Sequence, residues 1–370
     1  MRTSRLVGLG RFATVSVLLA LATVLVLLNR EATRTDDALN RLSLVSSLRA
    51  ASLQEEMATA RSDAVLWSGF GNVRQRLAEI QAAWEELEPG AADRVRTLYV
   101  NENPFPEGEF FRLVDPGDGS AYSRSHALFQ QRIQQFLAVH EYRDILLLNG
   151  DAEVVYSANK EPEFATNLVS GPWRDTHLAQ TARAARDLTA GQVALSDFEP
   201  YEPSGGAWAL FIAGPVGTAE DRGGPGALVF QLGAARLGAR IARLRDQRGS
   251  ARTVVLGDGY HIVGQSPWIE ASGNGMDALE SGVRRRAREA GAGSGLLRTG
   301  DGTEVLAAWA PLSFEGIQWV VLSLADREEI RSEGASERRM LLIVALLLWA
   351  TAAVLTLGRR KAAPLERHHI

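Results

Sequence analysis

The sequence predicts an α+β protein with two tandem lobes built on antiparallel sheets, a long N-terminal helical stalk and two flanking transmembrane helices. Two runs without a charged residue, 12–28 and 340–357, are each close to the roughly 20 apolar residues that cross a bilayer. Residues 31–67 are polar with scattered apolar positions and contain no proline, which favours a helix that continues out of the first run. Between the runs, a hairpin, a helical insert and further strands occur twice.

Charges beside the two apolar runs predict their orientation. Basic residues lie on the outer side of both runs: Arg2, Arg5 and Arg11 before the first, and Arg359, Arg360 and Lys361 after the second. Both chain ends are therefore expected in the cytoplasm, although Arg338 and Arg339 lie on the other side of the second run. A cleaved signal peptide is the alternative for the first run, but Asn29-Arg30-Glu31 follows it in place of small residues. A buried soluble helix is the alternative for the second.

The stalk is expected to be followed by a second helix after Gly69-Phe70-Gly71. Its apolar residues recur at spacings of four and three, which places them on one face: Val73, Leu77, Ile80, Trp84 and Leu87. We expect this stripe to pack against the first helix, with a contact between two copies of the chain as the alternative. Pro89-Gly90 ends the helix, residues 101–118 are expected to form a loop, and residues 125–140 a further helix.

The first sheet pattern begins with two apolar runs, 145–148 and 153–156, joined by Asn149-Gly150. Asn-Gly between such runs predicts a hairpin, because both residues tolerate the positive φ of a tight turn. A polar segment with a helical run to residue 187 follows, and strands are expected at 208–213 and 227–232.

The second pattern repeats the first after an expected linker helix over 234–248. Residues 253–263 echo the hairpin, 276–289 are expected to be helical, and 304–310 and 318–324 to be strands. Residues 213–216 and 309–312, each containing a proline, predict equivalent turns, and Gly293-Ser294-Gly295 predicts a loop. Residues 325–339 contain no proline, so we expect one continuous helix there, leading into the second span.

A family resemblance follows from the segments YRDILLLNGDAEVVYS, SDFEPYEPSGGAWALFIAGPV and GALVFQL. They resemble the membrane-distal lobe of double Cache sensors, the PAS-like extracytoplasmic domains of bacterial chemoreceptors, histidine kinases and cyclases. The resemblance covers roughly residues 98–324 and is best over 142–232. It implies two PAS-like lobes in series, a bacterial inner membrane, and a bulk of the chain that is periplasmic or extracellular.

These observations divide the chain into eight parts. They are a cytoplasmic tail (1–11), a transmembrane helix (12–29), the stalk (30–97), a distal lobe (98–233), a proximal lobe (234–325), a juxtamembrane helix (326–339), a second transmembrane helix (340–358), and a cytoplasmic tail (359–370). Pro364-Leu365-Glu366 resembles the start of a HAMP linker, with a basic stop-transfer tail as the alternative.

The composition argues against several classes of function. Charged residues make up 23% of the chain and the formal net charge is -4, so the chain lacks the excess of positive charge that is typical of nucleic-acid-binding proteins. The chain has no cysteine, which excludes disulfides and thiol chemistry. None of the common zinc, nucleotide, calcium or nucleophile motifs occurs, so we expect no catalytic residue, no metal site and no cofactor. A periplasmic hydrolase would need a nucleophile and a base brought together by the fold.

A small-ligand site in the distal lobe is the remaining prediction. Its candidate residues are Tyr142, Asp144, Tyr156, Trp173, Arg174, Asp197, Tyr201 and Trp208. Arg174 offers a bidentate fork to a carboxylate, Asp197 can accept from an ammonium group, and the aromatic side chains can wall an organic ligand. The alternative is that the aromatic residues are core and the charged ones form surface pairs. Amino-acid-binding double Cache receptors carry an Arg two residues before a Trp-Tyr pair, where this sequence has Gly171, so that specificity is not carried over.

The sequence thus predicts a membrane-anchored sensor that binds a small ligand in the distal lobe and passes a conformational signal across the membrane. A parallel homodimer is expected, with a cytoplasmic output domain or partner protein that this chain does not contain. The alternative is an accessory or structural membrane protein whose lobes bind another protein.

Overall fold

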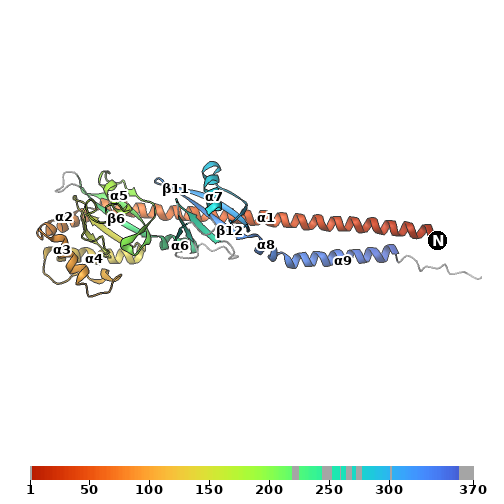
Figure 1. Cartoon of the computed structure of the whole chain (residues 1–370), viewed down its shortest axis with the longest axis horizontal. Coiled ribbons are helices and arrows are strands. Elements are labelled where there is room, and N and C mark those ends of the chain that lie inside the picture. The colour runs from red at the N-terminus through yellow and green to blue at the C-terminus, as the bar shows by residue number, and fades with distance from the viewer. Residues whose placement is uncertain are drawn as a thin grey trace, which may run out of the picture.

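One helix organises the whole molecule (Figure 1). The computed structural model describes residues 2–218, 225–243, 252–258, 260–263, 269–271, 277–300 and 302–357. Helix α1 (Arg2–Gly69) runs without a break from the first apolar run through both lobes, as predicted. Its second half is not a separate stalk but part of both lobes. Leu53, Met57 and Ala60 are fully buried in the distal core, and Leu42 is fully buried in the proximal core.

The two apolar segments lie side by side at one end of the molecule. Helix α9 (Ala335–Leu357) follows α1 there, and Trp349 Nε1 donates to Ser16 Oγ at 3.0 Å while its ring lies 5.5 Å from that of Phe12. Among the described residues, these two helices are long and apolar enough to cross a membrane. The apolar stretch of neither helix is buried by the rest of the protein.

The distal end carries helices α2 (Gly71–Glu85), α3 (Ala91–Arg96) and α4 (Ala121–His140), with short π- and 3-10-helical turns at Thr97–Asn101 and Phe110–Arg112. Ser120 starts α4 four residues earlier than expected, because its hydroxyl accepts from the Ser123 N–H at 3.0 Å. The stripe Val73, Leu77, Ile80 and Trp84 is buried within the chain, which decides between its two interpretations in favour of internal packing.

The distal sheet contains β1 (Asp144–Leu148), β2 (Val154–Ser157), β3 (Ala194–Leu195), β4 (Glu199–Tyr201), β5 (Ala207–Val216) and β6 (Gly226–Gly233). Its order is β2-β1-β6-β5-β3, with β4 also paired to β5. Helices α1, α2 and α4 lie on one face. The other face carries α5 (His177–Arg186) and the 3-10 turn Glu202–Ser204, and residues 165–168 run along the outer edge of β2, where the Val154 N–H donates to the Thr166 carbonyl oxygen at 2.9 Å.

The predicted hairpin β1–β2 is confirmed, but its turn differs from the expected one. Residues 149–153 separate the strands, and Ala152 takes the left-handed conformation with φ 64°. Asn149 holds this wider turn through its side chain, whose Oδ1 accepts from the N–H groups of Asp151 at 3.1 Å and Glu153 at 2.9 Å.

The proximal sheet repeats the distal one. After the linker helix α6 (Ala234–Arg243), it contains β7 (Arg252–Leu256), β8 (Tyr260–Val263), β9 (Ile269–Ala271), β10 (Gly293–Arg298), β11 (Glu304–Phe314) and β12 (Ile317–Asp326), with α7 (Asp277–Ala290) as the insert. The order β8-β7-β12-β11-β10, extended by β9, matches the distal order position by position. The predicted internal repeat is therefore confirmed.

Both predicted proline turns are wrong, for the same physical reason. Pro215 lies within β5 and Pro311 within β11. On one side Pro215 pairs with Ala227 and Pro311 with Val320, but on the other side the pairing of β5 with β3 stops at Ala213 and that of β11 with β10 stops at Trp309. A proline without an N–H fits a strand where no partner requires that donor.

Two further expectations were wrong. Gly293–Gly295 belongs to β10, where a side chain at position 293 would come within 2.7 Å of the Trp309 ring. The juxtamembrane helix is interrupted: β12 extends to Asp326, α8 spans Arg327–Glu333, and α9 starts after Gly334. The expectations for residues 244–248, 276 and 359–370, including the HAMP-like start, fall outside the described residues.

Candidate functional site

The residues predicted to form one pocket lie in four different environments. Arg174 is exposed and pairs with its neighbour Asp175 at 3.5 Å, so it points to solvent. Trp173 is half-buried and donates from Nε1 to the Pro162 carbonyl oxygen at 3.3 Å. Of the proposed cluster of Trp173, Arg174, Asp197 and Tyr201, Arg174 faces solvent, and the structure does not bring the other three together as one site.

Tyr142 and Tyr156 lie on the helical face of the distal sheet. The Tyr142 hydroxyl donates to Asp63 Oδ2 of α1 at 2.6 Å, and the Arg236 guanidinium lies 4.2 Å from its ring centre. The Tyr156 hydroxyl donates to Gln130 Oε1 of α4 at 2.7 Å. Both are core residues that fix helices to the sheet, which was the alternative interpretation of the aromatic candidates.

Asp197 and Trp208 lie where the two lobes meet. Asp197 Oδ1 accepts from the Trp319 indole N–H at 3.0 Å and from the Tyr260 hydroxyl, both in the proximal lobe. The Trp208 ring lies 5.1 Å from that of Tyr260, and Phe198 stacks on Trp319 at 5.8 Å. These contacts form a junction between the lobes, which we call the interlobe latch and define as Asp197, Phe198, Trp208, Tyr260 and Trp319.

Asp144 and Tyr201 belong to a buried polar cluster on the other face of the distal sheet. Asp144 and Gln231 are paired across β1 and β6, and Phe211 pairs with Gln231 across β5, so the three side chains share that face. Tyr201 packs edge-on against Phe211, with ring centres 4.9 Å apart. We call this group the acidic cluster and define it as Asp144, Ser157, Lys160, Glu161, Glu163, Tyr201, Ser204 and Gln231.

Hydrogen bonds hold one end of the acidic cluster in place. Asp144 accepts from the Ser157 hydroxyl at 2.6 Å and from the N–H groups of Ile145 at 2.7 Å and Asn159 at 3.0 Å. The Ser157 hydroxyl accepts in turn from the Lys160 N–H at 2.7 Å. Lys160 has φ 57°, and its buried Nζ donates to the Ala158 carbonyl oxygen at 3.1 Å.

A second chain of hydrogen bonds links Gln231 of β6 to Ser204 and Glu161. Gln231 Nε2 donates to the Ser204 hydroxyl at 2.8 Å, and that hydroxyl donates to Glu161. Glu161 also accepts from Arg143, at 2.7 Å from Nη2. Its charge is therefore balanced by an arginine that is itself partly in solvent.

Three side chains in the acidic cluster have polar oxygens with no hydrogen-bond partner in another described residue. Glu163 is fully buried, and apart from its own backbone N–H neither carboxyl oxygen has a hydrogen-bond donor. The Tyr201 hydroxyl and Gln231 Oε1 are also buried and unpartnered. Buried polar groups in folded proteins are almost always paired, so this group of acceptors requires an explanation.

Burial controls the charges of the cluster. It raises the pKa of Glu163 well above its ordinary value, and the nearby carboxylates of Glu161 and Asp144 raise it further. Burial also raises the pKa of Asp144 to about 7, again helped by Glu161. It lowers the pKa of Lys160 to about 7, although the charge of Asp144 opposes that shift. The cluster is thus acceptor-rich, and it gains or loses protons near neutral pH.

The sequence analysis missed Lys160, Glu163 and Gln231, although two of them left a signal. Lys160 is one of only two lysines in the chain, whose other basic residues are all arginines. Gln231 interrupts an otherwise apolar strand. Glu163 lies in a polar segment that reads as a surface loop, so nothing local marks it as buried. In the described part of the chain, no group of three or more His, Asp or Glu side chains is arranged to hold a metal ion.

No family model and no curated protein matches this sequence. Solved structures similar to this chain include the extracellular domain of a protein described as a histidine kinase, with 11% identity, coverage of 85% of this chain and 98% of that one, and a TM-score of 0.48. The ligand-binding domain of a Pseudomonas fluorescens chemoreceptor in complex with L-serine has 13% identity, coverage of 79% and 99%, and a TM-score of 0.44. The periplasmic sensory domain of a Campylobacter jejuni chemoreceptor has 11% identity, coverage of 80% and 98%, and a TM-score of 0.45.

These similar structures are sensor domains of the kind that the sequence resemblance indicated. At such identities and TM-scores the similarity carries no argument about the site, which is judged from this chain's own residues.

Lys160 gives a direct test of the acidic cluster, because it is the one lysine between the two apolar runs. Its pKa in the folded protein is lowered to about 7, against about 10.4 in an unfolded chain. Between these values the unfolded state binds more protons, so the free energy of unfolding should rise with pH by up to about 1.4 kcal/mol per unit. The variant Lys160→Met should lose that slope, and the carbon resonance of the labelled lysine should titrate near pH 7.

The matched control is Arg143→Met, which removes a nearby positive charge that does not titrate in this range. It should lower stability without changing the slope. A lysine resonance that titrates near 10.4, with equal slopes in all three proteins, would contradict the assignment.

Proposed function

We propose that the chain is a non-catalytic, membrane-anchored extracytoplasmic sensor whose acidic cluster binds the ammonium group of a small ligand. The observation that carries this proposal is the buried, unpartnered carboxyl group of Glu163 beside the free acceptors of Tyr201 and Gln231. An ammonium group has three donors and no acceptor, so it complements such a set. A bound cation would also stabilise the ionised form of Glu163, whose burial is otherwise unfavourable.

The interlobe latch supports a route for the signal. His177, at the start of α5, donates its backbone N–H to Glu199 at 2.7 Å, and its ring contacts the Asp197 carbonyl oxygen at 3.0 Å. Asp197 holds Trp319 of β12, and β12 ends at Asp326, which caps α8. A ligand that favours one position of residues 158–177, which lead from the acidic cluster to His177, would thereby favour one position of β12 and of the helices that follow it.

A homodimer along α1 is the quaternary arrangement that we propose. Leu44, Leu48 and Leu66 are 54–60% exposed on α1, whose opposite side is buried against both lobes. Exposed leucines on a long helix are typical of a surface that a second copy covers.

Ligand binding is tested by a thermal-shift screen of the whole chain in detergent. Ethanolamine and putrescine are compared with ethylene glycol and acetate, which lack the ammonium group. A ligand at 100 times its dissociation constant should add about 2.7 kcal/mol to the free energy of unfolding. The response to an amine should increase as pH rises, because Glu163 pairs with a cation only when ionised.

Glu163→Gln should abolish this response, whereas Glu202→Gln, on the exposed neighbour of Tyr201, should preserve it. Arg174→Ala should also preserve it, since Arg174 is at the surface. An amine response that is equal in Glu163→Gln would sink the assignment. A folded chain that responds to no amine would favour an accessory protein.

The latch is tested by a double-mutant cycle on the free energy of unfolding. Asp197→Ala and Tyr260→Phe remove the two ends of one hydrogen bond, so the double variant should lose about 1 kcal/mol less than the sum of the single variants. Asp197→Ala combined with Trp309→Phe is the control, because Trp309 packs against β10, and these changes should add. Additivity in both cycles would show that the two lobes are not energetically linked at this point.

Dimer formation is tested by disulfide cross-linking, which is clean because the chain has no native cysteine. Cysteines at Leu44 or Leu48 should cross-link between copies. A cysteine at Leu42 should not, since that side chain is buried against the proximal sheet. Monomeric bands at every exposed position of α1 would exclude this interface.

A further inference from the structure

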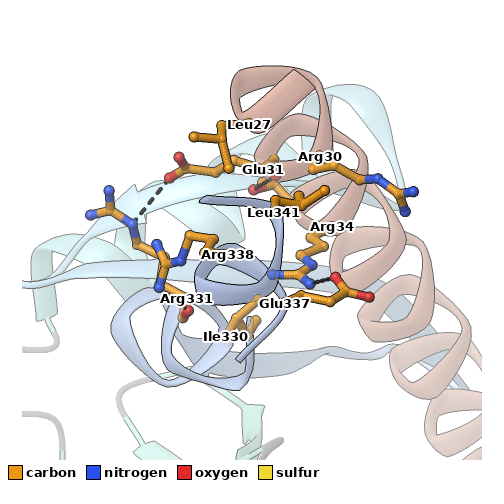
Figure 2. Close-up of a pocket in the computed structure, with 10 residues that line it drawn as sticks. Leu27, Arg30, Glu31, Arg34, Ile330, Arg331, Glu337, Arg338 and Leu341 are labelled. Carbon is orange, nitrogen blue, oxygen red and sulfur yellow. Dashed lines mark hydrogen bonds and ion pairs between the residues drawn. The ribbon is translucent and has the colours of Figure 1, made fainter. Parts of the chain in front are cut away.

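An arginine-rich pocket lies where α1 meets α8 and α9 (Figure 2). Four guanidinium groups and two carboxylates line it: Arg30, Arg34, Arg331, Arg338, Glu31 and Glu337. Arg34 pairs with Glu337, and Arg331 pairs with Glu31 at 3.0 Å, as the dashed lines in Figure 2 mark. The pocket therefore joins the first helix to the last two by ion pairs.

Two of the four arginines are not neutralised. Arg338 donates from Nη2 to the Arg331 carbonyl oxygen at 2.6 Å, which satisfies one donor but balances no charge. Arg30 is exposed and has no ion-pair partner among the described residues. The pocket thus carries an excess of positive charge and free guanidinium donors, and these complement a phosphate group in both charge and geometry.

The apolar side of the pocket continues the two apolar runs. Leu27 is the second-last residue of the first run and Leu341 the second residue of the other, and both line the pocket. Ile330 of α8 lines it as well. Apolar side chains on one side and guanidinium groups on the other match the boundary between acyl chains and headgroups in a bilayer.

The break between α8 and α9 provides space for the arginines. A side chain at Gly334 would collide with the guanidinium of Arg34, so the glycine allows Arg34 to reach Glu337. The arginines also lie on the side of the membrane where basic residues near a span are disfavoured. The charge bias that sets membrane topology therefore does not explain why arginines occur here.

We propose that this pocket binds the phosphate of an anionic phospholipid in the outer leaflet of the membrane. The inference rests on the proposed membrane insertion. Arg30 and Arg338 would contact the phosphate oxygens, and Leu27 and Leu341 the first part of the acyl chains. A lipid held there would contact α1 and α9 together, and so would fix the spacing of the two helices at the point where the signal enters the membrane.

The experiment uses the whole chain in an uncharged maltoside detergent, titrated with dioctanoyl phosphatidylglycerol. Dioctanoyl phosphatidylcholine and inorganic phosphate are titrated in parallel, and the apparent dissociation constant is taken from the shift in melting temperature. Phosphatidylglycerol should bind saturably and the other two much more weakly. The double variant Arg30→Gln/Arg338→Gln should bind it roughly tenfold more weakly, because charge-assisted contacts are lost.

Arg339→Gln is the matched control. It is compared with the single variant Arg338→Gln, because each removes one positive charge at neighbouring positions, but Arg339 does not line the pocket. An equal loss in Arg339→Gln, or no saturable binding of phosphatidylglycerol, would overturn the site in favour of general charge attraction. Inorganic phosphate that binds as tightly as the lipid would overturn the assignment to a lipid. Alkaline extraction of membranes containing the chain tests membrane insertion separately from lipid binding. Release of the chain would refute insertion, and retention of the chain without lipid binding would refute only the lipid site.

Discussion

The structure depends on the burial of α1 against both sheets. Its apolar side is covered by the distal core around Leu53 and Met57 and by the proximal residues around Leu42. Polar contacts fix its position along the axis: the Ser46 hydroxyl donates to the Ala308 carbonyl oxygen at 2.9 Å, and Glu56 pairs with Arg236 at 2.5 Å. Both contacts are at least partly removed from water, so losing either is unfavourable, and together they oppose sliding of the lobes along the helix.

The acidic cluster is the opposite kind of feature, because it lowers stability in the unliganded protein. Burying a carboxyl group without a donor is unfavourable, and Glu163 has only its own backbone N–H. The raised pKa of Asp144 and the lowered pKa of Lys160 both mean that the cluster stays partly neutral near pH 7. A ligand that supplies a positive charge removes part of this cost, and that difference between the free and bound states is what can shift a conformational equilibrium.

Three separate contacts connect this site to the membrane boundary. The segment 158–177 contacts the interlobe latch through His177, whose ring lies 3.0 Å from the Asp197 carbonyl oxygen. Trp319 of the latch belongs to β12, and β12 leads to α8. At the end of that path, Arg331 of α8 and Glu337 of α9 pair with α1. The proposed lipid pocket thus lies where the two routes to the membrane, α1 itself and the chain of contacts through both sheets, come together.

The sequence by itself determined the features that depend on local pattern. Apolar runs, the long proline-free helix, the hairpins and the twofold repeat were all predicted, because their periodicity and turn residues are local. Tertiary structure alone decided where the side chains of the site point. Arg174 and Asp197 are polar residues in the same kind of segment, yet one faces solvent and the other joins the lobes. Pro215 and Pro311 predicted turns because a sequence does not reveal that the neighbouring strand ends beside them. Glu163 looks like a surface residue until the fold places it under the sheet, since burial is a property of what packs around a residue and not of the residue itself.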